Sequence, residues 1–223
     1  MKRLNIFAAC VALGLAVTAH ADEIGRGSLF GTIEYRASSH ADLPKWGQVL
    51  AGIAREQATY EACAEDAQSC PSRRVMSWMA AVKSVEGADP FEQIRRINEF
   101  VNQREYRDDA SNWGRSDYWA TPLEFMRHSG DCEDYVIAKY VSLRMLGVPA
   151  EAMRMVVLKD TVRNLAHAVL AVEHDGDVLI LDNLTDAVLS HRRIKHYEPY
   201  YSVNEVTRWA HVTANQMVVA LNH

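Results

Sequence analysis

The sequence predicts an α+β fold in which helices come first and an antiparallel sheet follows. Apolar residues recur at helical spacing through the first half of the chain, and three strand-like runs follow a helix that starts at Cys132. The dipeptide Asp175-Gly176 separates the last two runs and is typical of a tight hairpin turn. Helices segregated from an antiparallel sheet define the α+β class.

The composition indicates a single ordered domain. The chain has 223 residues, of which 48% are apolar and 24% are charged, with 11 glycines and 6 prolines. A chain of this kind can bury a sizeable core, so disordered, collagenous and coiled-coil proteins are excluded. The formal net charge is −5 and no block of like charges occurs. Sequence-independent binding to nucleic acid is therefore not expected.

Residues 1–21 have the pattern of a secretory signal peptide, which leaves residues 22–223 as one mature domain. A basic pair and an apolar run from Leu4 to Val17 precede the small-x-small cleavage site Ala19-His20-Ala21. The apolar run is too short to span a bilayer, so no membrane span is expected in the mature chain. A lipid-modified Cys10 is the alternative, which the short apolar stretch before it disfavours.

Three helices are expected in the first half of the chain. The first runs from Leu43 to Cys63, the second from Val75 to Val85, and the third from Asp89-Pro90 to Val101. From Tyr106 to Pro122 the helical periodicity fails, and polar and aromatic residues predominate. A loop of this length inside a compact domain is often functional.

The second half begins with the helix that starts at Cys132 and ends before Gly147-Val148-Pro149, a helix stop signal. Three strands follow, at Met153 to Leu158, Ala166 to Glu173 and Val178 to Asn183.

Three cysteines lie beyond the signal segment. Cys63 and Cys70 flank a polar stretch, and we expect a local disulfide between them in an oxidising compartment. Cys132 then has no partner, so it is either buried and inert or reactive. Its place at the start of a helix, where the dipole lowers the pKa of a thiol, favours a thiolate nucleophile.

A thiolate nucleophile needs a base within hydrogen-bond reach and an acceptor that orients the base. If Asp175-Gly176 is a two-residue turn, Val169 pairs with Asp182, so His167 and Asp182 become diagonal neighbours on one face of the sheet. Taken singly, His167 is equally a satisfied sheet histidine and Asp182 a turn cap. With Cys132, the two residues stand where acyl-transfer chemistry requires them.

These residues lie in motifs that resemble those of the bacterial transglutaminase-like cysteine peptidases, the LapG family. The resemblance extends from about Leu29 to Tyr200. Its motifs are Gly130-Asp131-Cys132-Glu133-Asp134-Tyr135 with Ala138-Lys139-Tyr140, Trp113-Gly114-x-x-Asp117-Tyr118-Trp119-Ala120-Thr121-Pro122, and Ala166-His167-Ala168-Val169 with Leu181-Asp182-Asn183. The resemblance implies a papain-like, transglutaminase-like fold with Cys132 as nucleophile, His167 as general base and Asp182 as its orienting partner.

The same resemblance implies a biological role. It suggests a periplasmic, calcium-dependent endopeptidase that releases a large biofilm adhesin by cutting near the adhesin's amino terminus, at a paired-alanine site. It also implies that the periplasmic domain of an inner-membrane cyclic-di-GMP (c-di-GMP) receptor sequesters and inhibits the enzyme. Both partners are expected on resemblance alone.

The calcium expectation also has a chemical basis. Asp131, Glu133 and Asp134 place three carboxylates beside Cys132, and Ca²⁺ takes six to eight oxygen ligands. Repulsion from these carboxylates would raise the pKa of the thiol, and a bound dication would reverse that effect. Asp131 is alternatively the N-cap of the helix, with the other two complementing its dipole. Further candidate ligands lie in the preceding loop, at Asp108, Asp109, Asn112 and Asp117.

Three other functions remain open. The same three residues could transfer an acyl group to an amine, or the chain could be a non-catalytic calcium-binding interaction protein. Cys132, His167 and Asp182 could instead bind zinc. Four other histidines are expected at the surface, at His174, His191, His196 and His211.

Overall fold

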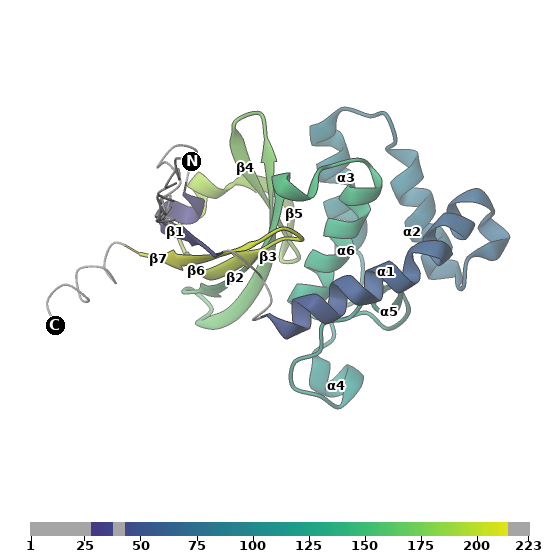
Figure 1. Cartoon of the computed structure of the whole chain (residues 1–223), viewed down its shortest axis with the longest axis horizontal. Helices are drawn as coiled ribbons and strands as arrows, with labels where there is room; N and C mark the ends of the chain where they lie inside the picture. Colours follow the sequence, from purple (N-terminus) through teal and green to yellow (C-terminus); the bar gives the residue numbers. More distant parts are fainter. Residues whose placement is uncertain (1–27, 38–42, 214–223) are drawn as a thin grey trace, which may run out of the picture.

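A computed structural model describes residues 28–37 and 43–213 of the chain (Figure 1). The expected signal peptide at residues 1–21, which includes Cys10, lies outside the described residues. Within the described ranges, no helix combines the length and the apolar character that crossing a membrane requires.

Helices occupy one half of the molecule and a sheet occupies the other (Figure 1). The three expected helices are present as α1 (Pro44–Glu65), α2 (Arg73–Ser84) and α3 (Pro90–Asn102). Proline stands at the start of α1 and α3, where its missing N–H costs no hydrogen bond. The Ser72 and Asp89 side chains accept backbone N–H groups at the starts of α2 and α3.

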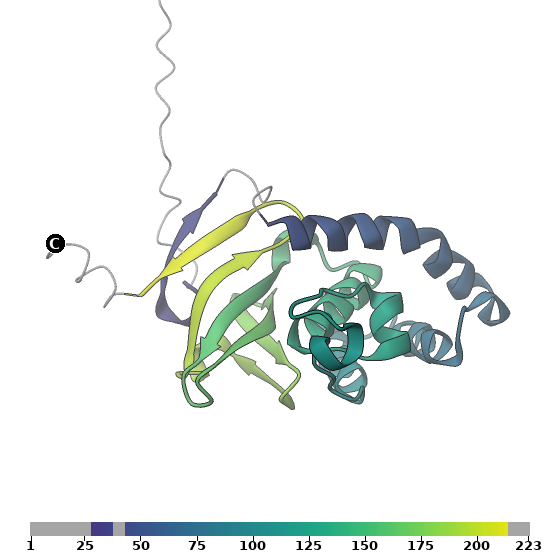
Figure 2. The ribbon, with the colours of Figure 1, turned by 90° about the horizontal axis from the view of Figure 1, so that it is seen from below.

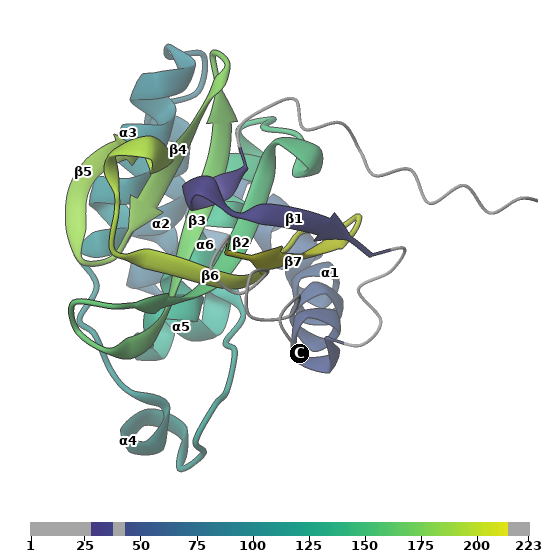
Figure 3. The same cartoon turned by 90° about the vertical axis from the view of Figure 1, so that its left-hand side faces the viewer.

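Two short helices lie in and directly after the segment expected to be a loop. They are α4 (Asp109–Trp113), which lies apart from the other helices (Figure 3), and α5 (Pro122–His128). α5 begins with a capping box, in which the Glu124 carboxylate accepts the backbone N–H of Thr121 at 2.8 Å. This start signal is visible in the sequence, whereas α4 is too short to show a periodicity.

Among the described residues, seven strands form one antiparallel sheet in the order β1-β7-β6-β2-β3-β4-β5, which confirms the α+β class. The three expected strands are β2, β3 and β4, and the other four were not predicted. The strands are β1 (Ile33–Arg36), β2 (Met153–Asp160), β3 (Leu165–His174), β4 (Asp177–Asp182), β5 (Thr185–Ser190), β6 (Tyr197–Val203) and β7 (Arg208–Val212). Helix α6 (Cys132–Met145) starts where predicted, and short 3₁₀ turns occur at η1 (Leu29–Gly31), η2 (Ala67–Ser69), η3 (Ala150–Ala152) and η4 (His191–Arg193).

The sheet is curved (Figure 2). Its two faces contribute to two separate hydrophobic cores. Successive side chains of a strand point to opposite faces, so β3 contributes to both. Ala168, Leu170 and Val172 belong to the large core that the helices share. Val169 and Ala171 belong to a smaller core on the other face, to which η1 also contributes. His167 lies two residues before Val169 in the strand, so it shares the face of the smaller core.

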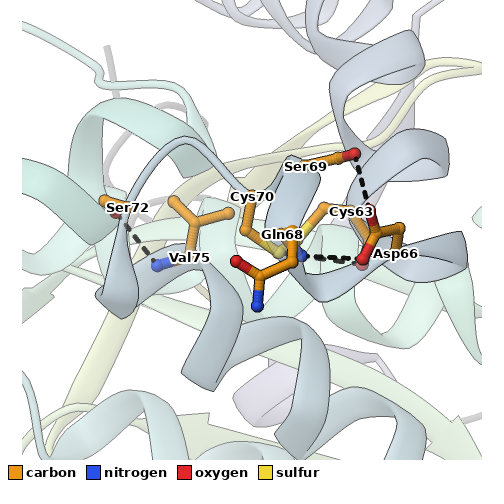
Figure 4. The surroundings of a disulfide bond; sticks show 7 residues. All are labelled: Cys63, Asp66, Gln68, Ser69, Cys70, Ser72 and Val75. Carbon is orange, nitrogen blue, oxygen red and sulfur yellow. Dashed lines mark hydrogen bonds between the residues drawn. A yellow bond between two sulfur atoms is a disulfide. The ribbon is translucent and has the colours of Figure 1, made fainter.

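A disulfide joins Cys63, near the end of α1, to Cys70, which confirms the pairing expected from the sequence (Figure 4). Between the two cysteines the chain turns through η2, where the Asp66 carboxylate accepts the backbone N–H of Gln68 at 2.9 Å. The disulfide therefore closes a short loop between α1 and α2.

Two histidines expected at the surface are buried, because they take part in hydrogen-bond networks that no local pattern reveals. His191 Nδ1 accepts the backbone N–H of Phe30 at 3.1 Å. His211 lies between the hydroxyls of Thr32 and Ser202, at 2.8 Å from each. Thr32 gives its hydroxyl proton to the carbonyl of Leu29, so His211 Nδ1 must donate to Thr32 and Nε2 must accept from Ser202.

Removing the disulfide should destabilise the fold moderately. In a double variant Cys63→Ser with Cys70→Ser, we expect the free energy of unfolding to fall by about 2 kcal/mol, because a short closed loop restrains the unfolded chain only modestly. Denaturant titration without reductant measures the effect. Equal stability of variant and wild type would show that the bond contributes nothing to the fold.

The buried His211 should make the protein sensitive to acid. Burial lowers the pKa of His211 to about 4 from its ordinary value of 6.5, so the folded state resists protonation that the unfolded chain accepts. The contribution of His211 to stability should be fully present above pH 6.5 and should fall by up to about 3 kcal/mol as the pH falls towards 4. His211→Gln should flatten this decline in thermal melts, and the half-exposed His174→Gln should not. An unchanged slope in His211→Gln would contradict the assignment.

Candidate active site and metal centre

The start of α6 is held in place by one buried carboxylate. Asp134 accepts the backbone N–H of Ala120 on Oδ1 at 2.7 Å and that of Asp131 on Oδ2 at 3.2 Å. Asp131 is the N-cap residue of α6, as the alternative interpretation of the sequence expected. The turn that carries Cys132 is thereby tied to the loop between α4 and α5.

Glycine is required directly before this turn. A Cβ built on Gly130 would lie 1.9 Å from Asp134 Oδ2, far closer than any non-bonded contact allows. The preceding residue, Ser129, has a φ of 66°, a left-handed conformation that is uncommon outside glycine. The tight approach of the chain to Asp134 therefore explains the glycine at position 130.

The thiol of Cys132 is half-buried and lies 3.2 Å from Glu133 Oε2. Burial raises the pKa of this thiol, and the charges of Glu133 and Asp131 raise it further, whereas the backbone N–H of Ala168 acts in the opposite direction. The lowering of the thiol pKa that was expected from the helix dipole is thus outweighed by burial and, after it, by the carboxylates. The contact with Ala168 places the sulfur beside β3, at the residue that follows His167.

The β3–β4 hairpin has the predicted register, in which His174 pairs with Asp177 and Ala171 with Ile180. This register brings His167 and Asp182 together, with His167 Nε2 at 2.9 Å from Asp182 Oδ1. Both side chains are buried. The predicted diagonal pair is therefore present.

Asp182 accepts two more hydrogen bonds. The Tyr197 hydroxyl donates to Oδ2 at 2.5 Å, and the backbone N–H of Leu184 donates to Oδ1 at 3.0 Å. Burial alone raises the pKa of Asp182, but the hydrogen bonds it accepts, first among them that of His167, hold the pKa below its ordinary value. Asp182 is thus a buried, ionised acceptor.

Five carboxylates from the loop, the N-cap and the first turn of α6 lie close together, and two of them, those of Asp131 and Glu133, lie beside the thiol. Three overlapping groups have ligand atoms within 4.8 Å of one another in the described part of the chain: Asp131, Cys132 and Glu133; Asp109, Asp131 and Asp134; Asp109, Asp117 and Glu133. His167 and Asp182 join no such group there, so the geometry does not support the zinc alternative. The expected metal residues Asp131, Glu133 and Asp134 are therefore neighbours, and Asp109 and Asp117 complete the cluster.

This cluster suits a hard divalent cation. Asp109 Oδ1 and Asp131 Oδ1 are buried and find no hydrogen-bond partner among the described residues. Burial, a hydrogen bond with Glu133 and the neighbouring negative charges raise the pKa of Asp131 to about 9. Clustered oxygen ligands of this kind fit Ca²⁺, whose charge would compensate their repulsion.

Of the four loop candidates, the structure separates two from the cluster. Asp108 caps α4, where its Oδ1 accepts the backbone N–H of Ser111 at 2.9 Å. Asn112 donates its side-chain amide to the carbonyl of Ser129 at 3.0 Å. Both residues shape the loop, which leaves Asp109 and Asp117 as the candidate ligands from that segment.

Tyr197 is the residue of this site that the sequence did not reveal. It belongs to β6, which pairs with β2 and was not predicted. A lone tyrosine some fifteen positions after Asp182 carries no local signal, because only the folded sheet brings the two together.

The close approach at Gly130 can be tested directly. Gly130→Ala should destabilise the protein by several kcal/mol or prevent folding, because the new methyl group would displace the Asp134 carboxylate and leave buried backbone N–H groups unpaired. Gly47→Ala is the matched control: it lies in α1 with nothing within 4 Å of an added Cβ, so it should stabilise by up to about 1 kcal/mol. Thermal melts of both variants check this, and similar stabilities would contradict it.

Comparisons with known proteins identify the family of this chain. The family model of the bacterial transglutaminase-like cysteine proteinases matches residues 53–217. Calcium-bound LapG of Legionella pneumophila is 31% identical, over 68% of this chain and 87% of that chain, with a TM-score of 0.60. EGTA-treated LapG of the same organism is 31% identical, over 69% and 86%, with a TM-score of 0.61. No curated protein matched. The chain belongs to the bacterial transglutaminase-like cysteine proteinases.

Proposed function

We propose that this cysteine peptidase acts through Cys132 as nucleophile, His167 as general base and Asp182 as the residue that orients the base. The observation that carries the proposal is the buried His167–Asp182 hydrogen bond beside Ala168, whose N–H contacts the thiol. Since Asp182 accepts from Nε2, the other imidazole nitrogen, Nδ1, is the one left for the thiol proton.

The reaction then follows from these positions. His167 Nδ1 takes the thiol proton while Cys132 Sγ attacks the carbonyl carbon of the scissile peptide bond. The imidazolium returns that proton to the leaving amine as the C–N bond breaks, which leaves a thioester on Cys132. Nδ1 next removes a proton from water, and the hydroxide releases the acid product and the thiol. The backbone N–H of Cys132 would contribute to binding the oxyanion.

Calcium is proposed as the resident ion. Asp109, Asp117, Asp131, Glu133 and Asp134 would hold it, and the calcium-bound LapG of Legionella pneumophila supports the assignment. A dication there would offset the carboxylate charges that otherwise raise the pKa of the thiol. The proposal also explains why unpartnered carboxylate oxygens are buried next to a nucleophile.

The substrate and the regulator are proposed from the family. We propose that the enzyme is exported to the periplasm, cleaves a large surface adhesin near its amino terminus at a paired-alanine site, and so promotes release of a biofilm. An inner-membrane c-di-GMP receptor would inhibit it through a periplasmic domain. The likeness to LapG, at 31% identity over most of that chain, supports this role.

A cleavage assay tests the proposal. Purified protein is mixed with an adhesin amino-terminal fragment that contains a paired-alanine site, and products are identified by mass. We expect cutting that Cys132→Ala abolishes and that Asp182→Asn reduces by about tenfold or more, because a neutral amide no longer stabilises the imidazolium of His167. Asp177→Asn, at the opposite end of β4, is the control and should retain activity.

Ligation of an added amine instead of hydrolysis would favour acyl transfer. Binding of the fragment without cutting would favour the interaction protein.

Calcium dependence is tested in a separate experiment. Chelation by EGTA should stop cleavage and lower the melting temperature, and added Ca²⁺ should restore both. Asp109→Asn should weaken the response to Ca²⁺ at least tenfold, because it removes a charged ligand. Asp108→Asn is the matched control, since asparagine caps a helix as well as aspartate does. Identical calcium titrations for the two variants would contradict the assigned site.

A further inference from the structure

Asp182 is fixed from two sides, and only one of them is the histidine. Its Oδ1 accepts from His167 Nε2 and from the backbone N–H of Leu184, while Oδ2 accepts from the Tyr197 hydroxyl at 2.5 Å. Each oxygen therefore has a donor that does not depend on His167. The plane of the carboxylate is set before the imidazole takes part.

The contact from Tyr197 spans the sheet. Tyr197 begins β6 and Asp182 ends β4, and β2 and β3 lie between these strands in the sheet order. The hydrogen bond thus crosses one face of the curved sheet, which Figure 2 shows bending round. β4 and β6 are not paired, so the backbone hydrogen bonds of the sheet do not impose this contact. It depends on the Tyr197 and Asp182 side chains themselves.

The surroundings of Tyr197 leave its hydroxyl little freedom. The side chain is 6% exposed, and its ring packs edge-on against Phe30 and His196, at centroid distances of 5.8 and 4.5 Å. The ring also lies 5.8 Å from that of His167. Burial and the bond to Asp182 raise the pKa of Tyr197, so the hydroxyl keeps its proton and acts as a donor.

We infer that Tyr197 is a positioning residue that holds the carboxylate of Asp182 in the plane facing His167 Nε2. The inference rests on the roles proposed above for His167 and Asp182. Without the hydroxyl, Oδ2 would have no donor, and apart from His167 only the backbone N–H of Leu184 would hold the carboxylate, through Oδ1. The carboxylate plane could then tilt about Oδ1, which would weaken the fixed acceptor that keeps the proton of His167 on Nε2. Tyr197 would then act on the reaction only through Asp182.

Lys139 of α6, in the helical layer, also interacts electrostatically with Asp182 and Asp186. It is fully buried, and its Nζ has no hydrogen-bond partner in the described ranges. Burial lowers the pKa of Lys139 to about 7, and an amine that makes no hydrogen bond to the carboxylate of Asp182 gives no direction to it. The Tyr197 hydroxyl is therefore the group that fixes the position of Asp182 Oδ2.

The variant Tyr197→Phe isolates this role, because it keeps the ring contacts and removes only the hydroxyl. With calcium and the adhesin fragment, we expect kcat to fall about tenfold or more while KM stays within about twofold. The ¹⁵N NMR spectrum of His167 should change from the Nε2–H tautomer to a mixture of tautomers. Tyr140→Phe is the matched control: its buried hydroxyl donates to Glu205 at 3.0 Å, and its loss should leave kcat and the tautomer unchanged.

The outcomes separate this inference from the proposed function. Wild-type kcat and tautomer in Tyr197→Phe, with activity reduced in Asp182→Asn, would overturn the role of Tyr197 alone. Wild-type turnover in Asp182→Asn would overturn the proposed triad. If Tyr197→Phe does not fold, the wild-type protein offers a second measurement. A downfield hydroxyl proton of Tyr197 that is lost in Asp182→Asn supports the bond, and its absence from the wild-type spectrum overturns the inference.

Discussion

Asp134 holds the beginning of α6 against the preceding loop through hydrogen bonds from Ala120 and Asp131, and the geometry of the site depends on this contact. The carboxylate is fully buried, and its pKa is raised well above the ordinary value, chiefly by burial. It can approach the backbone closely only because Gly130 has no side chain. The thiol and the acidic loop are placed by the same small arrangement of backbone and carboxylate.

Two electrostatic effects compete at Cys132. The start of a helix favours a thiolate by about 0.3–1 kcal/mol, whereas neighbouring carboxylates in a half-buried setting act more strongly in the opposite sense. Burial, Glu133 and Asp131 accordingly raise the pKa of the thiol. A helix start is therefore insufficient to activate this cysteine. This balance is the physical reason for linking the proposed nucleophile to a cation site.

The sequence predicted the parts of this structure that depend on local order. Helical periodicity located α1, α2, α3 and α6, and one Asp-Gly turn set the register that joins His167 to Asp182. Contacts between distant segments escaped prediction. β6 and β7 pair far from the hairpin, the burial of His211 depends on Thr32 and Ser202, and Tyr197 meets Asp182 only in the folded sheet. Four loop residues were candidate ligands, and only their positions in three dimensions distinguish Asp109 and Asp117 from Asp108 and Asn112.

The proposed nucleophile and its base belong to different layers of the fold, with Cys132 on α6 and His167 on β3. Where α6 packs on β3, both layers contribute small residues to the shared core, including Ala138 and Ala168. A misplacement of about 1 Å can cost on the order of a hundredfold in rate. If Cys132 and His167 react as proposed, side-chain size where α6 packs on β3 sets their alignment, so substitutions there would change turnover without altering any residue that touches the substrate.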